Sequence, residues 1–232
     1  MRKAYKFRLY PNREQTDRLV RTLDTCRLLY NDLLAARKEI YEATGESVGY
    51  YRQKRELVGM KRVNDRLTLV HSPVLQDVAR RVKLSFDGFF RRIRDGETPG
   101  HPRFKGKGWY KSFTYPQHEN GFAIKNGQLS LSKVGDVRMF QHRPIEGVIK
   151  TCTLKRDDVG DWSAIIVSVL PDVPKRAIQD TIGVDVGLKS LVVASNGLII
   201  EPPACLRGSE KKLAKLQRRL SRKKRGSKNR EK

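Results

Sequence analysis

The stretch between Phe113 and Leu170 places the strongest constraint on the fold, because short apolar runs alternate there with turn signals. Asn126-Gly127 and Asp157–Asp161 each separate two neighbouring runs and are typical of hairpin turns. Short strands at this spacing predict a small β-barrel. A further strand is expected over Ala4–Tyr10, where apolar and other residues alternate. The apolar runs of the barrel stretch cover residues 113–115, 122–125, 128–131, 137–140, 148–154 and 162–170.

Helical patterns lie between the first strand and the barrel stretch. Apolar residues recur at helical spacing from Glu14 to about Ala43. A polar helical stretch follows from Tyr50 to Arg66, and Ser72-Pro73 is a helix-start signal, with Ser72 as the N-cap residue. The aromatic residues of this last helix are expected in the core, because they too recur at helical spacing. The residues expected to face inward are Leu19, Leu23, Cys26, Tyr30, Leu33 and Leu34 on the first helix, and Leu75, Val78, Val82, Phe86, Phe89, Phe90 and Ile93 on the last.

The composition is strongly basic and indicates a polyanionic partner. Lys and Arg number 49 against 25 Asp and Glu, which gives a formal net charge of +24. The commonest partners of such a positive field are DNA and RNA. No apolar run is long enough to span a bilayer, and no signal peptide opens the chain, so no membrane partner is expected. The three cysteines are scattered, which suggests a reducing compartment and excludes a Cys-x-x-Cys zinc site within residues 1–232.

An aspartate interrupts an apolar run towards the end of the chain. Ile182, Val184 and Val186 are β-branched residues that favour a buried strand, and Asp185 stands between them. An ionised carboxylate in an apolar layer is costly unless a cation or hydrogen bonds compensate it. An acid fixed on a rigid strand can bind Mg²⁺ for phosphoryl chemistry, so Asp185 is the candidate catalytic and metal-binding residue. In the alternative interpretation, Asp185 caps a strand end or pairs with Lys189.

The residues after Asp185 predict a small sheet and a basic tail. Gly187 permits a turn, and Asn196-Gly197 is a hairpin signal between the apolar runs Leu191–Ala194 and Leu198–Ile200, so an antiparallel meander is expected. A tail rich in Lys and Arg follows, and its leucines recur at helical spacing. Its first half is therefore expected to form a helix lying on the meander. Because the sequence stops inside this basic segment, the chain is expected to be cut short.

Candidate nucleic-acid-binding residues lie on the two long helices, in the basic loop Gly96–Gly108 with the aromatic stretch after it, and in the tail. Basic residues interleaved with aromatic ones suit a surface that holds phosphates and stacks bases. The alternatives are an ordinary solvated helix face and aromatic residues that belong to the core. The candidates are Arg27, Arg37, Lys38, Arg80, Arg81, Arg103, Lys105, Lys107, Tyr115, Lys211, Lys215, Arg218, Arg219, Arg222, Lys223, Lys224 and Arg225.

Seven segments resemble, in their order along the chain, one known family. They are FRLYPN at Phe7–Asn12, TCRLLYN at Thr25–Asn31, HSPVLQ at His71–Gln76, HPRFK at His101–Lys105, SFTYPQ at Ser112–Gln117, IGVDVGLK at Ile182–Lys189 and KLQRRLSRKKRGSKNR at Lys215–Arg230. They are spread along the sequence, so the match covers essentially the whole chain. On these segments the chain resembles the OrfB/TnpB proteins of insertion-sequence transposons. These proteins have long been called transposases and are understood as RNA-guided DNA endonucleases related to the type V CRISPR effectors.

The resemblance implies an α+β fold: a wedge-type β-barrel with a helical insert, followed by the N-terminal part of a RuvC/RNase H-like domain. It also implies a guide RNA and a target DNA as partners, in the prokaryotic cytoplasm at the nucleoid. By resemblance, Asp185 is the first of three RuvC carboxylates that hold Mg²⁺, and the other two, with a four-cysteine zinc ribbon, lie further along than Lys232. The implied domains are the barrel at residues 1–10 and 105–170, the recognition insert at 11–104, a linker at 171–180, and the incomplete nuclease domain with its basic tail at 181–232.

The complete protein is expected to hydrolyse DNA phosphodiesters with Mg²⁺. Whether this chain is an enzyme by itself stays open, because it holds only the first expected carboxylate. One alternative is a nuclease-dead, guide-RNA-dependent DNA binder or an inactive transposase fragment. A second is an actin-like ATPase or sugar kinase, but the sequence shows no glycine-rich phosphate loop, and no small-molecule substrate is expected. A third is a helix-turn-helix transcription factor that uses Glu14–Ala43, which would leave Asp185 without a purpose.

Overall fold

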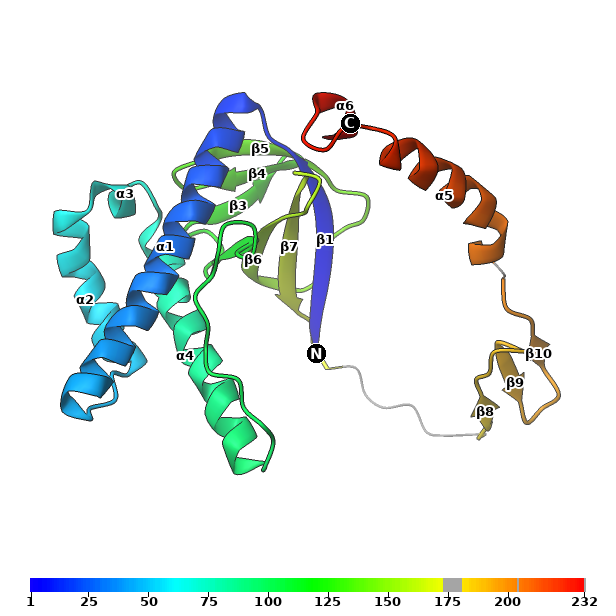
Figure 1. The fold of residues 1–232 in the computed structure, drawn as a ribbon, viewed down its shortest axis with the longest axis horizontal. Coiled ribbons are helices and arrows are strands. Elements are labelled where there is room, and N and C mark those ends of the chain that lie inside the picture. Colours follow the sequence, from blue (N-terminus) through cyan, green and yellow to red (C-terminus); the bar gives the residue numbers. More distant parts are fainter. Residues whose placement is uncertain (173–180, 204, 232) are drawn as a thin grey trace. The chain divides into compact units, whose positions relative to one another are not determined.

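The structure, a computed structural model, describes residues 1–172, 181–203 and 205–231. The chain forms two compact units, Met1–Val173 and Pro174–Lys232, which we call unit 1 and unit 2 (Figure 1). Most of the expected linker, from residue 173 to 180, lies outside the described residues. In the described ranges, no helix is both long and apolar enough to cross a membrane.

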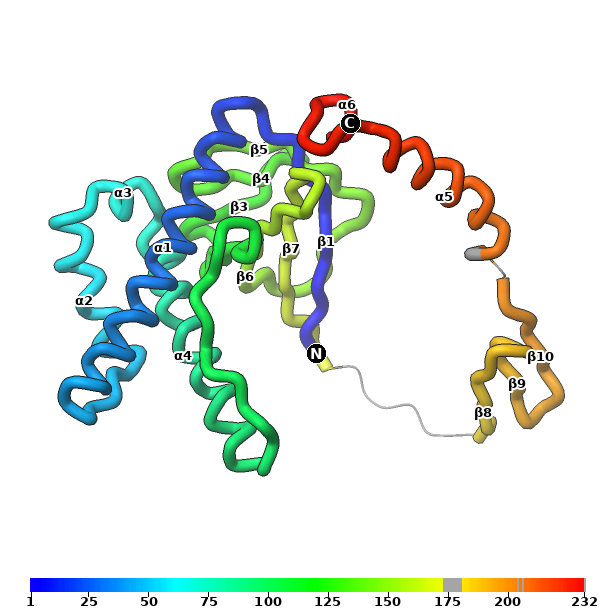
Figure 2. The backbone as a smooth tube through the Cα atoms, viewed as in Figure 1, coloured from blue at the N-terminus to red at the C-terminus, as the bar shows by residue number. Residues whose placement is uncertain are grey.

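Unit 1 is built on a seven-stranded antiparallel sheet with the order β2-β6-β7-β1-β5-β4-β3. The N-terminal strand therefore lies in the middle, between β7 and β5 (Figure 2). The sheet is nearly closed, and on its open side Tyr115 of β2 donates its hydroxyl hydrogen to the carbonyl oxygen of Ser132 at 2.9 Å. The prediction of a small barrel is thus confirmed in part, because the strands form a nearly closed sheet in which β2 and β3 do not pair. Its strands are β1 (Arg2–Tyr10), β2 (Ser112–Tyr115), β3 (Phe122–Lys125), β4 (Gln128–Leu131), β5 (Gly135–Phe140), β6 (Val148–Arg156) and β7 (Trp162–Val169).

Alternation along the strands decides which side chains fill the interior of this sheet. Tyr5, Phe7 and Leu9 of β1 are buried, and on β7 every second residue from Trp162 to Ser168 is buried. Successive strand residues point to opposite faces, so each of these strands presents one apolar face to the core. Inside, the rings of Phe113 and Trp162 meet edge to face with their centroids 6.3 Å apart.

The two hairpin turns predicted between these strands are confirmed. Asn126 and Gly127 have φ angles of 48° and 72°, and a two-residue turn of type I′ requires positive values at both positions. In the β6–β7 turn, the side chain of Asp157 accepts hydrogen bonds from the backbone N–H groups of Val159 and Asp161, at 3.1 and 2.8 Å. A side chain that bonds its own backbone in this way fixes the turn locally.

Four helices lie between β1 and β2 in the chain. The first begins at a capping box, in which the side chains of Asn12 and Gln15 each accept a hydrogen bond from the other residue's backbone N–H. It ends at Gly45, whose φ of 72° favours glycine. Helix α1 packs on α4, which packs on β2, so the helices cover one side of the sheet. The helices are α1 (Arg13–Thr44), α2 (Tyr50–Val63), α3 (Asp65–Thr68) and α4 (Ser72–Arg94).

Two details of α4 correct the sequence prediction, although its extent is confirmed. His71, not Ser72, is the N-cap residue, and it makes no side-chain capping hydrogen bond. Phe90 and Ile93 are 54 % and 49 % exposed instead of facing inward, because the C-terminal half of α4 runs beyond the sheet (Figure 1). The other residues predicted to face inward on α1 and α4 are buried or half-buried.

Unit 2 begins with a three-stranded antiparallel meander of order β10-β9-β8, which confirms the predicted topology. The predicted burial is wrong. Ile182, Val184 and Val186 are 54 %, 60 % and 70 % exposed, and the leucine stripe of α5 is 45–50 % exposed. So short a sheet buries little by itself, and in the described part of unit 2 neither α5 nor another layer covers it. The elements are β8 (Val184–Asp185), β9 (Val192–Ala194), β10 (Ile199–Ile200), α5 (Cys205–Ser221) and α6 (Lys228–Glu231).

Candidate nucleic-acid interface

Two of the candidate arginines, both on α1, hold parts of unit 1 together. Arg27 pairs with Asp24 at 2.8 Å and donates a hydrogen bond to the backbone carbonyl of Lys105 at 3.3 Å. The guanidinium carbon of Arg37 lies 3.9 Å from the centroid of the Phe86 ring, a cation–π contact. Burial lowers the pKa of Arg37. Because both guanidinium groups are engaged within the fold, they are less available to phosphates than the sequence suggests.

Arg80 and Arg81 are neighbours on α4 with opposite environments. Arg81 pairs with the carboxylate of Asp77 at 2.9 Å. Its other nitrogens donate hydrogen bonds to the carbonyl oxygen of Ser112 at 2.6 Å and to the hydroxyl of Thr114 at 2.8 Å, both on β2. Arg80 is exposed. Arg81 therefore fastens α4 to the sheet, and Arg80 is the one of the two that can reach a ligand.

Sequence reasoning missed Asn31, which anchors the basic loop to α1. Its side-chain oxygen accepts a hydrogen bond from the backbone N–H of Lys105 at 2.8 Å, and its side-chain nitrogen donates to the carbonyl of the same residue at 3.1 Å. This pairing fixes the loop backbone and leaves the Lys105 side chain half-exposed. The only trace of this role in the sequence is an asparagine inside a helix, a position that disfavours the residue.

Replacing Asn31 with alanine is expected to destabilise unit 1 by about 1–3 kcal/mol, because the partly buried backbone N–H of Lys105 loses its partner and its carbonyl keeps only the hydrogen bond from Arg27. Urea unfolding followed by the fluorescence of buried Trp162 measures this change. The matched control is Asn120→Ala, which removes an exposed side chain whose amide bonds only Gln117. A loss of stability no larger than that of the control would contradict the anchoring role.

The aromatic candidate Tyr115 requires a correction. Its ring is 1 % exposed and stacks on His71 with the centroids 5.9 Å apart. Burial raises the pKa of its hydroxyl, which is already bonded to Ser132. A ring enclosed in the core cannot stack on a base, so the predicted binding role of Tyr115 is wrong. Trp109, by contrast, is 82 % exposed and presents its ring to solvent just before β2.

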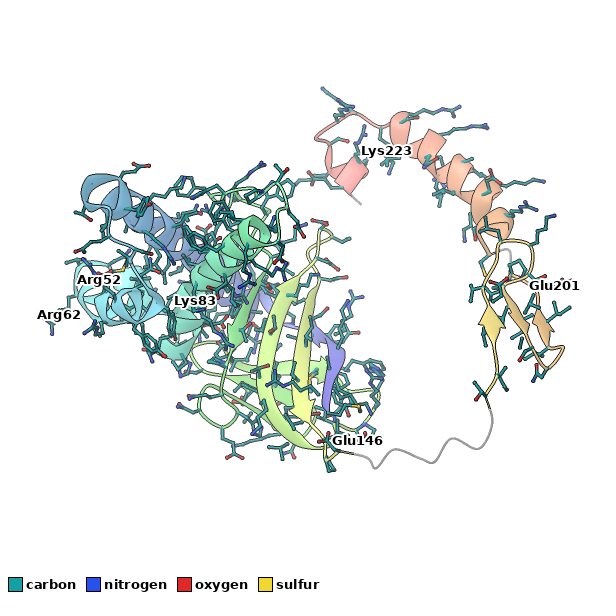
Figure 3. The ribbon with its side chains drawn as sticks, turned by 90° about the horizontal axis from the view of Figure 1, so that it is seen from below. Arg52, Arg62, Lys83, Glu146, Glu201 and Lys223 are labelled. Carbon is teal, nitrogen blue, oxygen red and sulfur yellow. The ribbon has the colours of Figure 1, made fainter. Side chains whose placement is uncertain are left out.

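The remaining candidate cations are accessible. Arg80, Arg103 and Lys107 are exposed, and Lys38 is half-buried with its ammonium group 5.5 Å from the centroid of Phe104. In unit 2 side chains project from α5 and from the segment after it, where Lys223 lies (Figure 3). Clustered charge of one sign binds polyanions with a strong salt dependence. The exposed tail candidates are Lys211, Lys215, Arg218, Arg219, Arg222, Lys223, Lys224 and Arg225.

Asp185 ends β8 and is exposed, and its backbone pairs with Val193 of β9. Beside it, Gly183 and Ser195 exchange hydrogen bonds of 3.0 and 2.9 Å that hold the two strands together. Across the described ranges, the carboxylate forms no ion pair with Lys189 or with any other cation. The pairing alternative is therefore not observed.

The side chains around Asp185 do not make a complete magnesium site. In the part of the chain that the structure describes, no three His, Cys, Asp or Glu side chains are grouped closely enough to hold a metal ion. Mg²⁺ requires near-octahedral oxygen coordination and usually takes one or two carboxylates together with waters and phosphates. A lone exposed carboxylate can contribute one ligand to such a site, but it cannot position two metal ions for phosphodiester hydrolysis.

The fold and its charges define a class: a basic α+β protein whose nearly closed sheet carries inserted helices, followed by an acid-bearing meander and a cationic tail. Comparison with known proteins is consistent with this class. Residues 1–46 match an OrfB model described as "Helix-turn-helix domain", and residues 164–232 match an OrfB model described as "Probable transposase". The chain belongs to the OrfB/TnpB family of insertion-sequence transposases, as the resemblance implies. Within residues 1–46, however, the structure has one strand and one continuous helix.

Two curated relatives match nearly the whole chain. It is 32 % identical over 238 residues to a protein of Streptomyces pristinaespiralis named "Putative RNA-guided DNA endonuclease", covering 100 % of this chain and 58 % of the relative. It is 31 % identical over 225 residues to "Putative RNA-guided DNA endonuclease InsQ" of Escherichia coli strain K12, covering 95 % of this chain and 54 % of that relative. The chain thus spans little more than half the length of either relative.

Proposed function

We propose that this chain binds a guide RNA and its target DNA as part of an RNA-guided DNA endonuclease. The observation that carries the proposal is the set of cations that the fold leaves accessible: Arg80, Arg103 and Lys107 in unit 1, and the tail in unit 2. Phosphate-binding surfaces require such cations. The names of the two relatives support the same function.

The inserted helices and the sheet of unit 1 suit different parts of RNA-guided DNA binding. In RNA-guided recognition, base pairing with the guide reads the target sequence, and the protein holds the backbone and shape of the duplex. In our proposal unit 1 is a wedge-type barrel with its recognition insert. The inserted helices hold the guide–target duplex, and the sheet with its basic loop holds the scaffold of the RNA. In the same proposal the protein lies at the nucleoid, where its DNA partner is.

Unit 2, in the same proposal, is the first part of a RuvC/RNase H-like domain, and Asp185 is the first of its Mg²⁺-binding carboxylates. An acid at the end of the first strand of an antiparallel meander supports this assignment. The exposed apolar side chains of β8 and its neighbours support it too, because a nuclease core needs further elements to cover that sheet. Among the described residues no cluster of side chains completes a metal site, so in this proposal Asp185 acts together with further carboxylates of the nuclease.

Purification of residues 1–232 from the cells that express them tests the proposal. The protein is expected to carry RNA that digestion or high salt removes. Rebinding of the RNA is expected to weaken with salt, with a log–log slope of about −0.7 for each single-strand phosphate contact. A chain that neither carries nor rebinds RNA at low salt would refute the proposal. A chain that binds RNA but is not directed to complementary DNA would instead fit an inactive transposase fragment.

A further inference from the structure

A cleft of about 710 Å³ opens in unit 1 between α1, the end of the basic loop and the β6–β7 turn. Its lining includes two of the basic residues predicted to bind nucleic acid, Arg27 and Lys107. Its volume lies within the range of about 300–1,000 Å³ that is usual for small-ligand pockets. Its lining combines apolar side chains, among them Leu28 and Leu69, with a set of cations.

Cations outnumber carboxylates in the lining of this cleft by six to three. Arg66, Lys107 and Arg156 all line it, and none of the three takes part in an ion pair with any carboxylate in the described ranges. Two of the carboxylates are taken up by other lining cations, since Arg27 pairs with Asp24 and Lys111 with Asp158. The third, Asp157, accepts hydrogen bonds from the backbone of its own turn. The remaining excess of cations in one hollow favours an anionic ligand, and guanidinium groups are suited to phosphate.

One buried polar atom of the cleft lining, the Nε of Arg156, has no hydrogen-bond partner among the described residues. Buried polar groups in native structures are nearly always satisfied, so this atom points to a missing ligand. Tyr110 also lines the cleft but is only 8 % exposed, and its hydroxyl lies near Arg81, Asp77 and Cys26 inside unit 1. Burial raises the pKa of that hydroxyl, which therefore keeps its proton.

We propose that this cleft binds one unstacked nucleotide of a single-stranded nucleic acid, with the phosphate on Arg66, Lys107 and Arg156 and the base against Leu28 and Leu69. The proposal rests on the proposed function and names a subsite for it. A duplex cannot bring a phosphate to the buried Nε of Arg156, because paired bases hold the backbone outside a hollow of this size. A flipped-out nucleotide can enter, and unstacked bases are what proteins read in single strands. The exposed ring of Trp109, next to Tyr110, is available to stack the following base.

The cleft is tested by a matched pair of substitutions at adjacent positions of β6. Arg156→Gln and Lys155→Gln each remove one positive charge, but only Arg156 lines the cleft, whereas Lys155 is exposed. The affinity of the full chain is measured by fluorescence anisotropy with an oligouridylate and an oligothymidylate of about 12 nucleotides, within the range of single-strand site sizes. Arg156→Gln is expected to weaken binding by about tenfold, and Lys155→Gln by much less.

A second pair of substitutions tests whether the cleft must be open for binding, without any change of charge. Thr25→Phe fills part of the cleft, and Val63→Phe adds the same ring on the exposed face of α2. Only the first is expected to weaken binding, and thermal unfolding checks that both variants are folded. Weaker binding of the oligouridylate alone assigns the nucleotide to RNA, and weaker binding of both oligonucleotides assigns it to either strand type. If Arg156→Gln and Lys155→Gln weaken binding equally and Thr25→Phe has no effect, the cleft inference fails and the proposed function stands. If the unaltered chain binds neither oligonucleotide, both fail.

Discussion

Replacing Arg81 with methionine is expected to destabilise unit 1 by about 3 kcal/mol, the lower end of the cost of breaking a buried ion pair, because the pair with Asp77 is only partly buried. The substitution leaves the carboxylate of Asp77, whose side chain is 14 % exposed, without its cation, and removes the hydrogen bonds to Ser112 and Thr114. Burial by itself lowers the pKa of Arg81, but Tyr110 and Asp77 outweigh that effect and raise it. The guanidinium is therefore charged throughout the accessible pH range. Urea unfolding followed by Trp162 fluorescence measures the loss.

The matched control is Arg80→Met, one residue away on the same helix. Arg80 is exposed, so its replacement is expected to change the free energy of unfolding by less than about 0.5 kcal/mol. The same substitution is expected to reduce the log–log salt slope of RNA binding by about 0.7, if its one phosphate contact is to a single strand. Equal effects of the two substitutions on stability would show that the contacts of Arg81 with β2 carry no net energy.

The sheet of unit 1 is predictable from the sequence because its signals are local. The alternation of Tyr5, Phe7 and Leu9 marks β1, and Asn126-Gly127 sets a hairpin, each within a few residues. Strand order is not local in this sense. Nothing in the first ten residues says that β1 pairs with β7 and β5, more than a hundred residues later.

The roles of the cations are only partly predictable, because Arg80 and Arg81 are alike in the sequence. What separates them is the packing of α4 on β2, which buries one and leaves the other in solvent. The spacing of Asp77 and Arg81, four residues apart on a helix, is the one available hint of an ion pair. Tyr115 shows the converse error, since its place beside a basic loop suggests base stacking and its alternation along β2 puts it in the core.

The exposure of β8 shows a second limit of prediction from the sequence. An apolar run predicts what a strand can bury, but not whether the layer that covers it belongs to the same stretch of chain. Val184 and Val186 are typical of a buried strand, yet they are 60 % and 70 % exposed among the described residues. The position of Asp185 at the end of β8 agrees with the predicted topology, and its role in catalysis stays a prediction.

Replacing Asp185 with asparagine is expected to abolish Mg²⁺-dependent cleavage of target DNA, in any length of the protein that cuts. Asparagine keeps the size of the side chain and removes the negative charge that a hard cation requires. RNA binding and the free energy of unfolding are expected to stay unchanged, because the exposed carboxylate holds no ion pair in the described ranges. Gel analysis of DNA cut by the protein–RNA complex measures the effect.

Glu201→Gln is the matched control for this substitution. Glu201 directly follows β10 and is exposed like Asp185, but it comes too soon after β8 to be the second RuvC acid that the resemblance implies. Its replacement is expected to leave cleavage intact. If Asp185→Asn still cuts, Asp185 is not a metal ligand, and the carboxylate on β8 does not belong to the nuclease site. If Glu201→Gln loses cleavage as well, the acids of the site lie closer together in sequence than a RuvC arrangement allows, and the assignment of unit 2 to that fold is wrong.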